Sequence, residues 1–150
     1  MSAARTGTLV ELATAEAVRA AWPVVQQLRS HLTEDGFVAQ VGAMRAEGYR
    51  AIALLRDNLP CAYAGFRLLN MLAYGRVLYV DDLVTDETAR DTGAGRTLLA
   101  WLVGEARRQG CPGVQLDSGV QRFAAHAFYF GRGMRIAAYH FAMALDDHRD

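Results

Sequence analysis

A glycine-bearing turn, Arg90-Asp91-Thr92-Gly93-Ala94-Gly95-Arg96, follows an apolar run that ends at Val84 and precedes an amphipathic segment. If a helix begins within this turn, its first backbone N–H groups have no intrahelical acceptor and lie at the positive end of the helix dipole. Gly93 and Gly95 also lack the Cβ atoms that would keep a bulky anion away from the backbone. The turn is therefore typical of a phosphate-binding site.

Spacing narrows the choice of phosphorylated ligand. A P-loop requires a Lys after its last glycine, and none follows here. The dinucleotide fingerprint requires a third glycine near the start of a βαβ unit, whereas position 98 is Leu and the turn lies deep in the chain. The remaining pattern is R-x-x-G-x-G, for which an ordinary glycine-rich strand-to-helix turn is the alternative interpretation.

Two adjacent acids, Asp81 and Asp82, interrupt the apolar run that leads into the turn. A buried carboxylate costs free energy unless it is paired, so acids in such a run need a partner or a function. Alternation places neighbouring side chains on opposite faces of a strand unless a bulge intervenes. One acid can then face a substrate cleft while the other is structural; the alternative is that both are strand-end acids bound to backbone or to Arg.

Composition restricts the function classes. We expect a single domain, residues 1–150, because this length is sufficient for a hydrophobic core of its own. The 16 basic and 16 acidic residues cancel, which argues against a nucleic-acid partner. Every basic residue is Arg, so catalysis by lysine is excluded. Cys61 and Cys111 stand alone and the four His show no metal-ligand spacing, so no metal is expected.

The sequence also bears on location. Residues 1–10 contain no apolar core of a signal peptide, and no apolar run approaches the roughly 18 residues of a membrane span. We therefore expect a cytoplasmic protein that makes no membrane contact.

Hydrophobic periodicity predicts the elements that position these residues, in the order β-α-α-β-β-β-α-β-α-β, which is an α/β (α+β) fold. Pro23 is expected to kink or split the first helix. The expected strands are Thr8–Leu12, Arg50–Arg56, Cys61–Met71, Arg76–Val84, Val114–Asp117 and Ile136–Leu145. The expected helices are Ala15–Arg29, Thr33–Ala46, a helix from the glycine turn through Gln109, and Arg122–Phe130.

Both the turn and the element order resemble the GNAT N-acetyltransferase superfamily, whose acyl-coenzyme A pyrophosphate loop has the R-x-x-G-x-G pattern. Residues 125–134, Ala-His-Ala-Phe-Tyr-Phe-Gly-Arg-Gly-Met, are similar to the family's A-x-x-[FL]-Y-x-x-x-G-[FM] segment. Residues 79–82, Tyr-Val-Asp-Asp, resemble the Y-L-E-D strand of the diamine N-acetyltransferases. The resemblance implies a mixed, mostly antiparallel central sheet flanked by helices.

The resemblance also implies roles. Tyr129 takes the position of the general acid, and a phenol of pKa about 10 stays protonated at neutral pH and can donate to a leaving thiolate. Asp81 takes the position of the acid that removes the amine proton through water, and Asp82 that of a carboxylate that contacts the substrate ammonium. Leu83 and Val84 are expected to pair their backbone with the pantetheine amides, and Arg90, Asp91, Thr92, Gly93, Ala94, Gly95 and Arg96 to surround the pyrophosphate.

Helical spacing places Tyr129 on a polar face of its helix with Arg122 and His126, and places Phe123 and Phe130 on an apolar face. Many family members have Asn where this chain has Arg122, so the acceptor is in question; Arg122 is an alternative contact for a coenzyme phosphate or an acidic substrate. His126 is interpreted as structural or as a proton shuttle. Additional acids for a polyamine are limited to Glu34 and Asp35 at the start of the second helix.

These features predict an acetyltransferase that moves an acetyl group from acetyl-CoA, as co-substrate, to a primary amine by direct attack. The expected acceptor is a small molecule, and a homodimer is compatible with the resemblance. Two alternatives stand beside this prediction: a non-catalytic acyl-CoA-binding sensor, and an acetyltransferase whose acceptor is a protein amino group. Because a sensor needs the phosphate loop but neither a proton donor nor a base, Tyr129 and the paired acids favour the enzyme.

Overall fold

The computed structural model describes residues 7–146, and the chain divides into two compact units, Met1–Leu116 and Asp117–Asp150. The first unit contains a five-stranded sheet with the order β1-β2-β3-β4-β5. Its first four strands are antiparallel neighbours, and β5 pairs with β4 in parallel. The strands are β1 (Thr8–Glu11), β2 (Arg50–Arg56), β3 (Leu59–Met71), β4 (Gly75–Thr85) and β5 (Gly113–Leu116).

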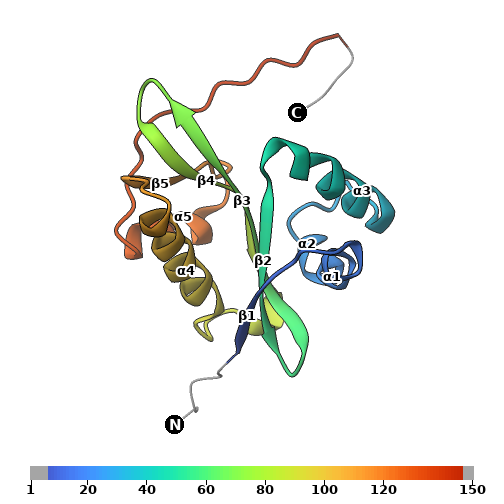
Figure 1. The fold of residues 1–150 in the computed structure, drawn as a ribbon. Coiled ribbons are helices and arrows are strands. Elements are labelled where there is room, and N and C mark those ends of the chain that lie inside the picture. Colours follow the sequence, from blue (N-terminus) through green and yellow to red (C-terminus); the bar gives the residue numbers. More distant parts are fainter. Residues whose placement is uncertain (1–6, 147–150) are drawn as a thin grey trace. The chain divides into compact units, whose positions relative to one another are not determined.

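Helices cover both faces of this sheet (Figure 1). One face is covered by α1 to α3 and the other by α4, and the two short 3-10 helices lie in connecting segments. The mixed, mostly antiparallel sheet flanked by helices confirms the predicted fold class. The helices of the first unit are α1 (Ala15–Ala20), α2 (Trp22–Val25), α3 (Glu34–Met44), η1 (Arg45–Glu47), η2 (Glu87–Ala89) and α4 (Ala94–Arg108).

The helix starts follow local rules. Thr14 and Thr33 accept hydrogen bonds from the backbone N–H groups of Ala17 and Gly36, so each caps its helix as an N-cap threonine does. Pro23 occupies the first turn of α2, where it has no N–H to satisfy, and the predicted first helix is split there into α1 and α2. This split turns the chain toward α3.

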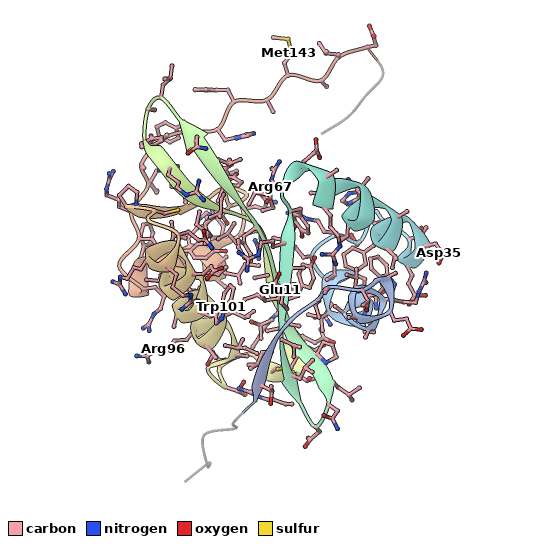
Figure 2. The ribbon with its side chains drawn as sticks, in the orientation of Figure 1. Glu11, Asp35, Arg67, Arg96, Trp101 and Met143 are labelled. Carbon is pink, nitrogen blue, oxygen red and sulfur yellow. The ribbon has the colours of Figure 1, made fainter. Side chains whose placement is uncertain are left out.

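Alternation along the strands builds a core on both faces of the sheet. Ala51, Ala53 and Tyr63 belong to the buried cluster under α1 to α3. Phe66 faces the other side, where its ring lies 5.7 Å from that of Trp101 on α4 (Figure 2). Which residues face α3 and which face α4 is therefore fixed by strand register.

The second unit contains one helix, α5 (Phe123–Gly131), among its described residues. The predicted final strand, Ile136–Leu145, is wrong, because residues 135–145 form no ladder with any described residue. Its apolar side chains alternate as in a strand, yet Tyr139, Phe141 and Met143 are exposed. Alternation favours a half-buried strand only where a neighbouring strand accepts its hydrogen bonds.

Among the described residues, no helix is long and apolar enough to cross a membrane. The cytoplasmic location, the homodimer and the single-domain organisation stay predictions from the sequence.

Candidate functional site

A single bulge in β4 decides where the two acids point. Gly65 of β3 pairs with Asp82 and Phe66 pairs with Val80, so Asp81 is the extra residue between them. Val80 lies on the α4 face with Phe66, because directly opposed residues of a ladder share a face. Without the bulge Asp82 would lie there too; with it, both Asp81 and Asp82 line a cavity on the α3 face. The sequence left two possibilities open, opposite faces or a bulge. The structure has the bulge, so both acids lie at the same cavity.

Each carboxylate is held by an arginine. Arg67 binds Asp81 through two hydrogen bonds, Nη2 to Oδ1 at 2.6 Å and Nε to Oδ2 at 3.1 Å. Arg29 donates Nε to Asp82 Oδ1 at 2.9 Å and Nη2 to the Asp81 carbonyl at 3.0 Å. Burial raises the pKa of Asp81, and Arg67 opposes that rise without cancelling it. Asp81 is consequently a stronger base than an exposed aspartate.

A chain of tyrosine hydroxyls ends on Asp82. Tyr49 donates to Asp82 Oδ2 at 2.8 Å, and the Tyr49 and Tyr63 oxygens lie 2.9 Å apart. Because Tyr49 uses its only proton on Asp82, Tyr63 is the donor to Tyr49. Burial raises the pKa of both phenols, so both stay protonated. Gly65 makes room for this chain, since a Cβ there would lie 1.7 Å from the Tyr49 oxygen.

The cavity next to these groups has a volume of about 310 Å³. Its polar lining is formed by the two acids, the two tyrosines, Arg29, His31 and Gln40, and its apolar lining comes from α2, α3 and the segment between them. Such a combination of apolar walls and a few convergent polar groups is typical of a small-molecule site. The apolar lining residues are Val25, Leu32, Phe37, Val41 and Met44.

Directly after the acids, the edge of β4 toward β5 is open. The parallel ladder with β5 ends at the pair Val80 and Leu116, whereas β4 continues to Thr85. Within the described part of the chain, residues 82–85 of β4 pair with β3 alone. Leu83 and Val84 therefore lie on a strand with a free edge, which can accept an extended ligand as an added strand would be accepted.

The glycine turn follows this edge and begins α4. Gly93 is the N-cap in a left-handed conformation, with φ of 86°, and no side chain caps the helix. The first helical bond joins Thr97 N–H to the Gly93 carbonyl at 3.0 Å. The N–H groups of Ala94, Gly95 and Arg96 precede that bond and are available at the positive end of the helix dipole. Arg96 is exposed and projects away from the start of α4 (Figure 2).

The turn is fixed in place by Arg56 at the end of β2. Arg56 donates to the Thr92 hydroxyl at 2.6 Å and to the Thr92 carbonyl at 3.2 Å. Arg90 and Asp91, which precede Thr92, are exposed, and Asp91 has a positive φ of 61°. A turn whose backbone is held on one side and exposed on the other can present its amides to an anion without reorganising.

The second unit holds the remaining predicted residue, Tyr129. Burial raises the pKa of Tyr129, and Arg122 opposes that rise, so the phenol holds its proton at neutral pH. On α5 the predicted polar face carries the buried residue, Tyr129, whereas Phe123 and Phe130 on the predicted apolar face are exposed. His126 Nε2 lies 2.8 Å from the Gly119 carbonyl, a contact that anchors the start of the helix.

Comparison with known proteins agrees with this geometry. Residues 9–134 match the model of the family described as "Acetyltransferase (GNAT) family". The chain belongs to the GNAT acetyltransferase family. It is 31% identical over 133 residues to the "Uncharacterized N-acetyltransferase YhdJ" of Bacillus subtilis (strain 168), and this match covers 87% of the chain and 94% of that protein. The chain is therefore an acyltransferase of the GNAT type.

Solved structures of acetyltransferases have a similar fold. A putative acetyltransferase from Agrobacterium tumefaciens str. C58 is 25% identical with a TM-score of 0.78, and the match covers 92% of this chain and 99% of that one. An aminoglycoside N-acetyltransferase, AAC(6')-Iy, was solved in complex with CoA; it is 13% identical with a TM-score of 0.78, and the match covers 94% of this chain and 97% of that one.

Sequence reasoning missed the partners of the acids in this GNAT chain, namely Arg29, Arg67, Tyr49 and Tyr63. Arg29 is separated from Asp82 by 53 residues and Tyr49 by 33, so no local spacing could reveal the contacts. The proposed extra acids, Glu34 and Asp35, bind Arg19 instead and do not line the cavity.

Proposed function

We propose that the protein transfers an acetyl group from acetyl-CoA to the primary amine of a small molecule. The observation that supports this most strongly is the continuity along one stretch of chain: paired acids at the cavity, then the free strand edge, then the phosphate-type turn. An amine in the cavity and a coenzyme along Leu83 to Arg96 would therefore meet at β4.

Members of this family use acetyl-CoA. In this chain, the glycine turn and the free edge of β4 would bind it. The N–H groups at the start of α4, together with Arg90 and Arg96, would face the pyrophosphate, and the free edge of β4 at Leu83 and Val84 would pair with the pantetheine amides. This arrangement supplies strand-type and anion-type contacts to one elongated ligand. It supports acetyl-CoA as co-substrate.

In the proposed mechanism, Asp81 removes a proton from the ammonium group of the acceptor through a water molecule, which leaves a neutral amine. The amine nitrogen bonds to the thioester carbonyl carbon as the carbon–sulfur bond breaks, and the departing thiolate takes the phenolic proton of Tyr129. The new amide nitrogen then releases its second proton to solvent, and the Tyr129 phenolate regains a proton from solvent. Asp82, held by Arg29 and Tyr49, would fix the ammonium group next to Asp81. The raised pKa of Asp81 suits a base, and the raised pKa of Tyr129 keeps it in the acid form.

The test is release of CoA thiol from acetyl-CoA in the presence of a panel of amines: arylalkylamines, alkylamines, diamines, polyamines, aminoglycosides and lysine peptides. Amine-dependent thiol release with a small molecule supports the proposal. Release with lysine peptides alone would replace the small-molecule acceptor by a protein amine. Confirmed CoA binding without release for any amine would favour a coenzyme sensor.

A further inference from the structure

The cavity on the α3 face carries an inference about the acceptor, and this inference rests on the proposed function. Its volume of about 310 Å³ lies at the lower end of the range of about 300–1,000 Å³ for small-molecule sites. An acceptor that fills it is therefore compact.

Charge balance in and around the cavity argues against an acceptor with several positive charges. Both carboxylate oxygens of Asp81 bind Arg67, and those of Asp82 bind Arg29 and Tyr49. Two acids thus face two guanidinium groups, and the sum of their charges is zero. His31, which also lines the cavity, contributes either no charge or a positive one.

The charges further out cancel in the same way. The Glu47 carboxylate raises the pKa of Arg67, and the Arg45 guanidinium lowers the pKa of Tyr63. These two groups therefore add one negative and one positive charge to the surroundings of the cavity. Glu34 and Asp35 share Arg19, and the one negative charge that this group keeps lies outside the cavity lining. A second or third ammonium group on an acceptor would therefore find no unpaired carboxylate among the described lining residues, yet would lose its hydration.

The remaining wall is apolar and partly aromatic. Phe37 is fixed by ring contacts on two sides, at 5.6 Å to Trp22 and 5.9 Å to Tyr63. Leu32 and Met44 are half-buried and line the same space. A hydrocarbon or aromatic group placed against this wall would be removed from water, which favours binding roughly in proportion to the area buried.

From these observations we infer that the acceptor is a compact primary amine with one positive charge and an apolar, aromatic or aliphatic body. Its ammonium group lies at the Asp81 and Asp82 side, and its body packs against Phe37, Leu32 and Met44. The diamine-type strand motif at residues 79–82 therefore does not bring diamine specificity with it.

The experiment compares kcat/KM for 2-phenylethylamine, 1,4-diaminobutane and spermidine at pH 8, with CoA affinity measured separately by calorimetry. We expect kcat/KM for 2-phenylethylamine to be about tenfold or more above that for both multiply charged amines. The reason is that its apolar ring is buried and no second charge loses its hydration. A higher kcat/KM for 1,4-diaminobutane or spermidine, or turnover of lysine peptides alone, would overturn the inference and leave the acetyltransferase proposal standing. No thiol release with any amine, despite CoA binding, would overturn the proposed function itself.

Two variant pairs test the physical reason. Arg67→Met leaves Asp81 without its partner and gives the cavity surroundings a net negative charge, so the preference is expected to shift toward 1,4-diaminobutane by about tenfold. Arg76→Met, which removes a cation from β4 bound to the Gln109 carbonyl, is the matched control and leaves the preference unchanged. Met44→Gln is expected to lower kcat/KM for 2-phenylethylamine by about tenfold, whereas Met44→Leu retains it. An unchanged preference in Arg67→Met would show that charge balance does not select the acceptor.

Discussion

Replacing Gly93 by Ala tests whether the turn before α4 binds the coenzyme phosphates. Gly93 has φ of 86° and is exposed, and a Cβ built there meets no heavy atom within 4 Å. Gly75, the first residue of β4, has φ of 72°, and a Cβ built there also meets no heavy atom within 4 Å. The two substitutions therefore impose the same backbone strain, and they differ in whether the residue lies in the proposed phosphate site.

The expected effect on stability is similar for both variants. An L-residue in the left-handed region costs roughly 1–2 kcal/mol, part of which is offset because Ala restricts the unfolded chain more than Gly. A net loss of about 1 kcal/mol lowers the Tm of a domain of this size by about 2–4 °C. For Gly93→Ala alone, a displaced phosphate would lose at least one charge-assisted hydrogen bond, about 1.5–3 kcal/mol, which raises the Kd for CoA by about 10- to 150-fold.

The assay combines a thermal unfolding scan with calorimetric titration of CoA and of pantetheine, which has no phosphate. We expect equal Tm shifts for Gly93→Ala and Gly75→Ala, weaker CoA binding in Gly93→Ala only, and the same pantetheine affinity in both variants. A folded Gly93→Ala protein with the wild-type Kd for CoA would refute the assignment of this turn to the phosphates. Equal weakening in both variants would trace the effect to strain instead.

Four further predictions concern single side chains. Tyr129→Phe is expected to lower kcat by about 10²-fold with an unchanged Kd for CoA, and wild-type turnover would remove this phenol from the mechanism. Asp81→Asn is expected to lower kcat/KM by about 10²-fold at pH 7. The deficit should be smaller at pH 10, because the amine there loses its proton without help from a base. A deficit that does not change with pH would contradict the role of Asp81 as base. Gly65→Ala places a Cβ against the Tyr49 oxygen and is expected to cost about 1–3 kcal/mol of unfolding free energy in a denaturant titration, whereas a neutral result would show that the hydroxyl chain is dispensable. Arg56→Ala releases the phosphate turn and is expected to weaken CoA binding about tenfold by calorimetry, with partial recovery in Arg56→Lys; unchanged affinity would mean that the turn holds its shape without this anchor.

Local signals predicted most of the first unit correctly. Thr14 and Thr33 were readable as N-caps because capping depends on a few neighbouring residues, and Pro23 was expected to break a helix because its ring removes a hydrogen-bond donor. The glycine turn was predicted for the same reason. Its chemistry lies in seven consecutive residues, so no distant part of the chain is needed to recognise it.

The site itself depends on pairings between distant residues. The bulge at Asp81 arises from the register between β3 and β4, and nothing in the sequence around Asp81 specifies that Gly65 pairs with Asp82 while Phe66 pairs with Val80. The partners Arg29 and Arg67 come from other elements, so the near-zero charge of the cavity could not be predicted. The interpretation of the acids as bound to Arg was kept open from the sequence, and the structure shows those bonds together with the cavity.

The second unit shows where periodicity fails. From Tyr139 to Leu145, large apolar side chains alternate with His or Ala, and this pattern predicted a strand that the structure lacks. Alternation in the sequence shows that the two faces of a segment differ in their side chains, but it does not show whether a partner strand is present. In α5 as well, hydrophobicity does not by itself indicate burial, because Phe123 and Phe130 are exposed and Tyr129 is buried.

The β4 bulge makes the proposed base, Asp81, easy to lose without disturbing the rest of the strand. Deletion of the single codon for Asp81 would restore regular alternation, because Asp82 would then follow Val80 directly, still opposite Gly65 and on the cavity face, and the ladder pairs on either side could re-form. The strand edge and the phosphate turn would remain. One step would thus convert the proposed enzyme into a protein that keeps the coenzyme surface and Asp82 at the cavity but has no base, so catalysis could be lost by inheritance while coenzyme recognition remained.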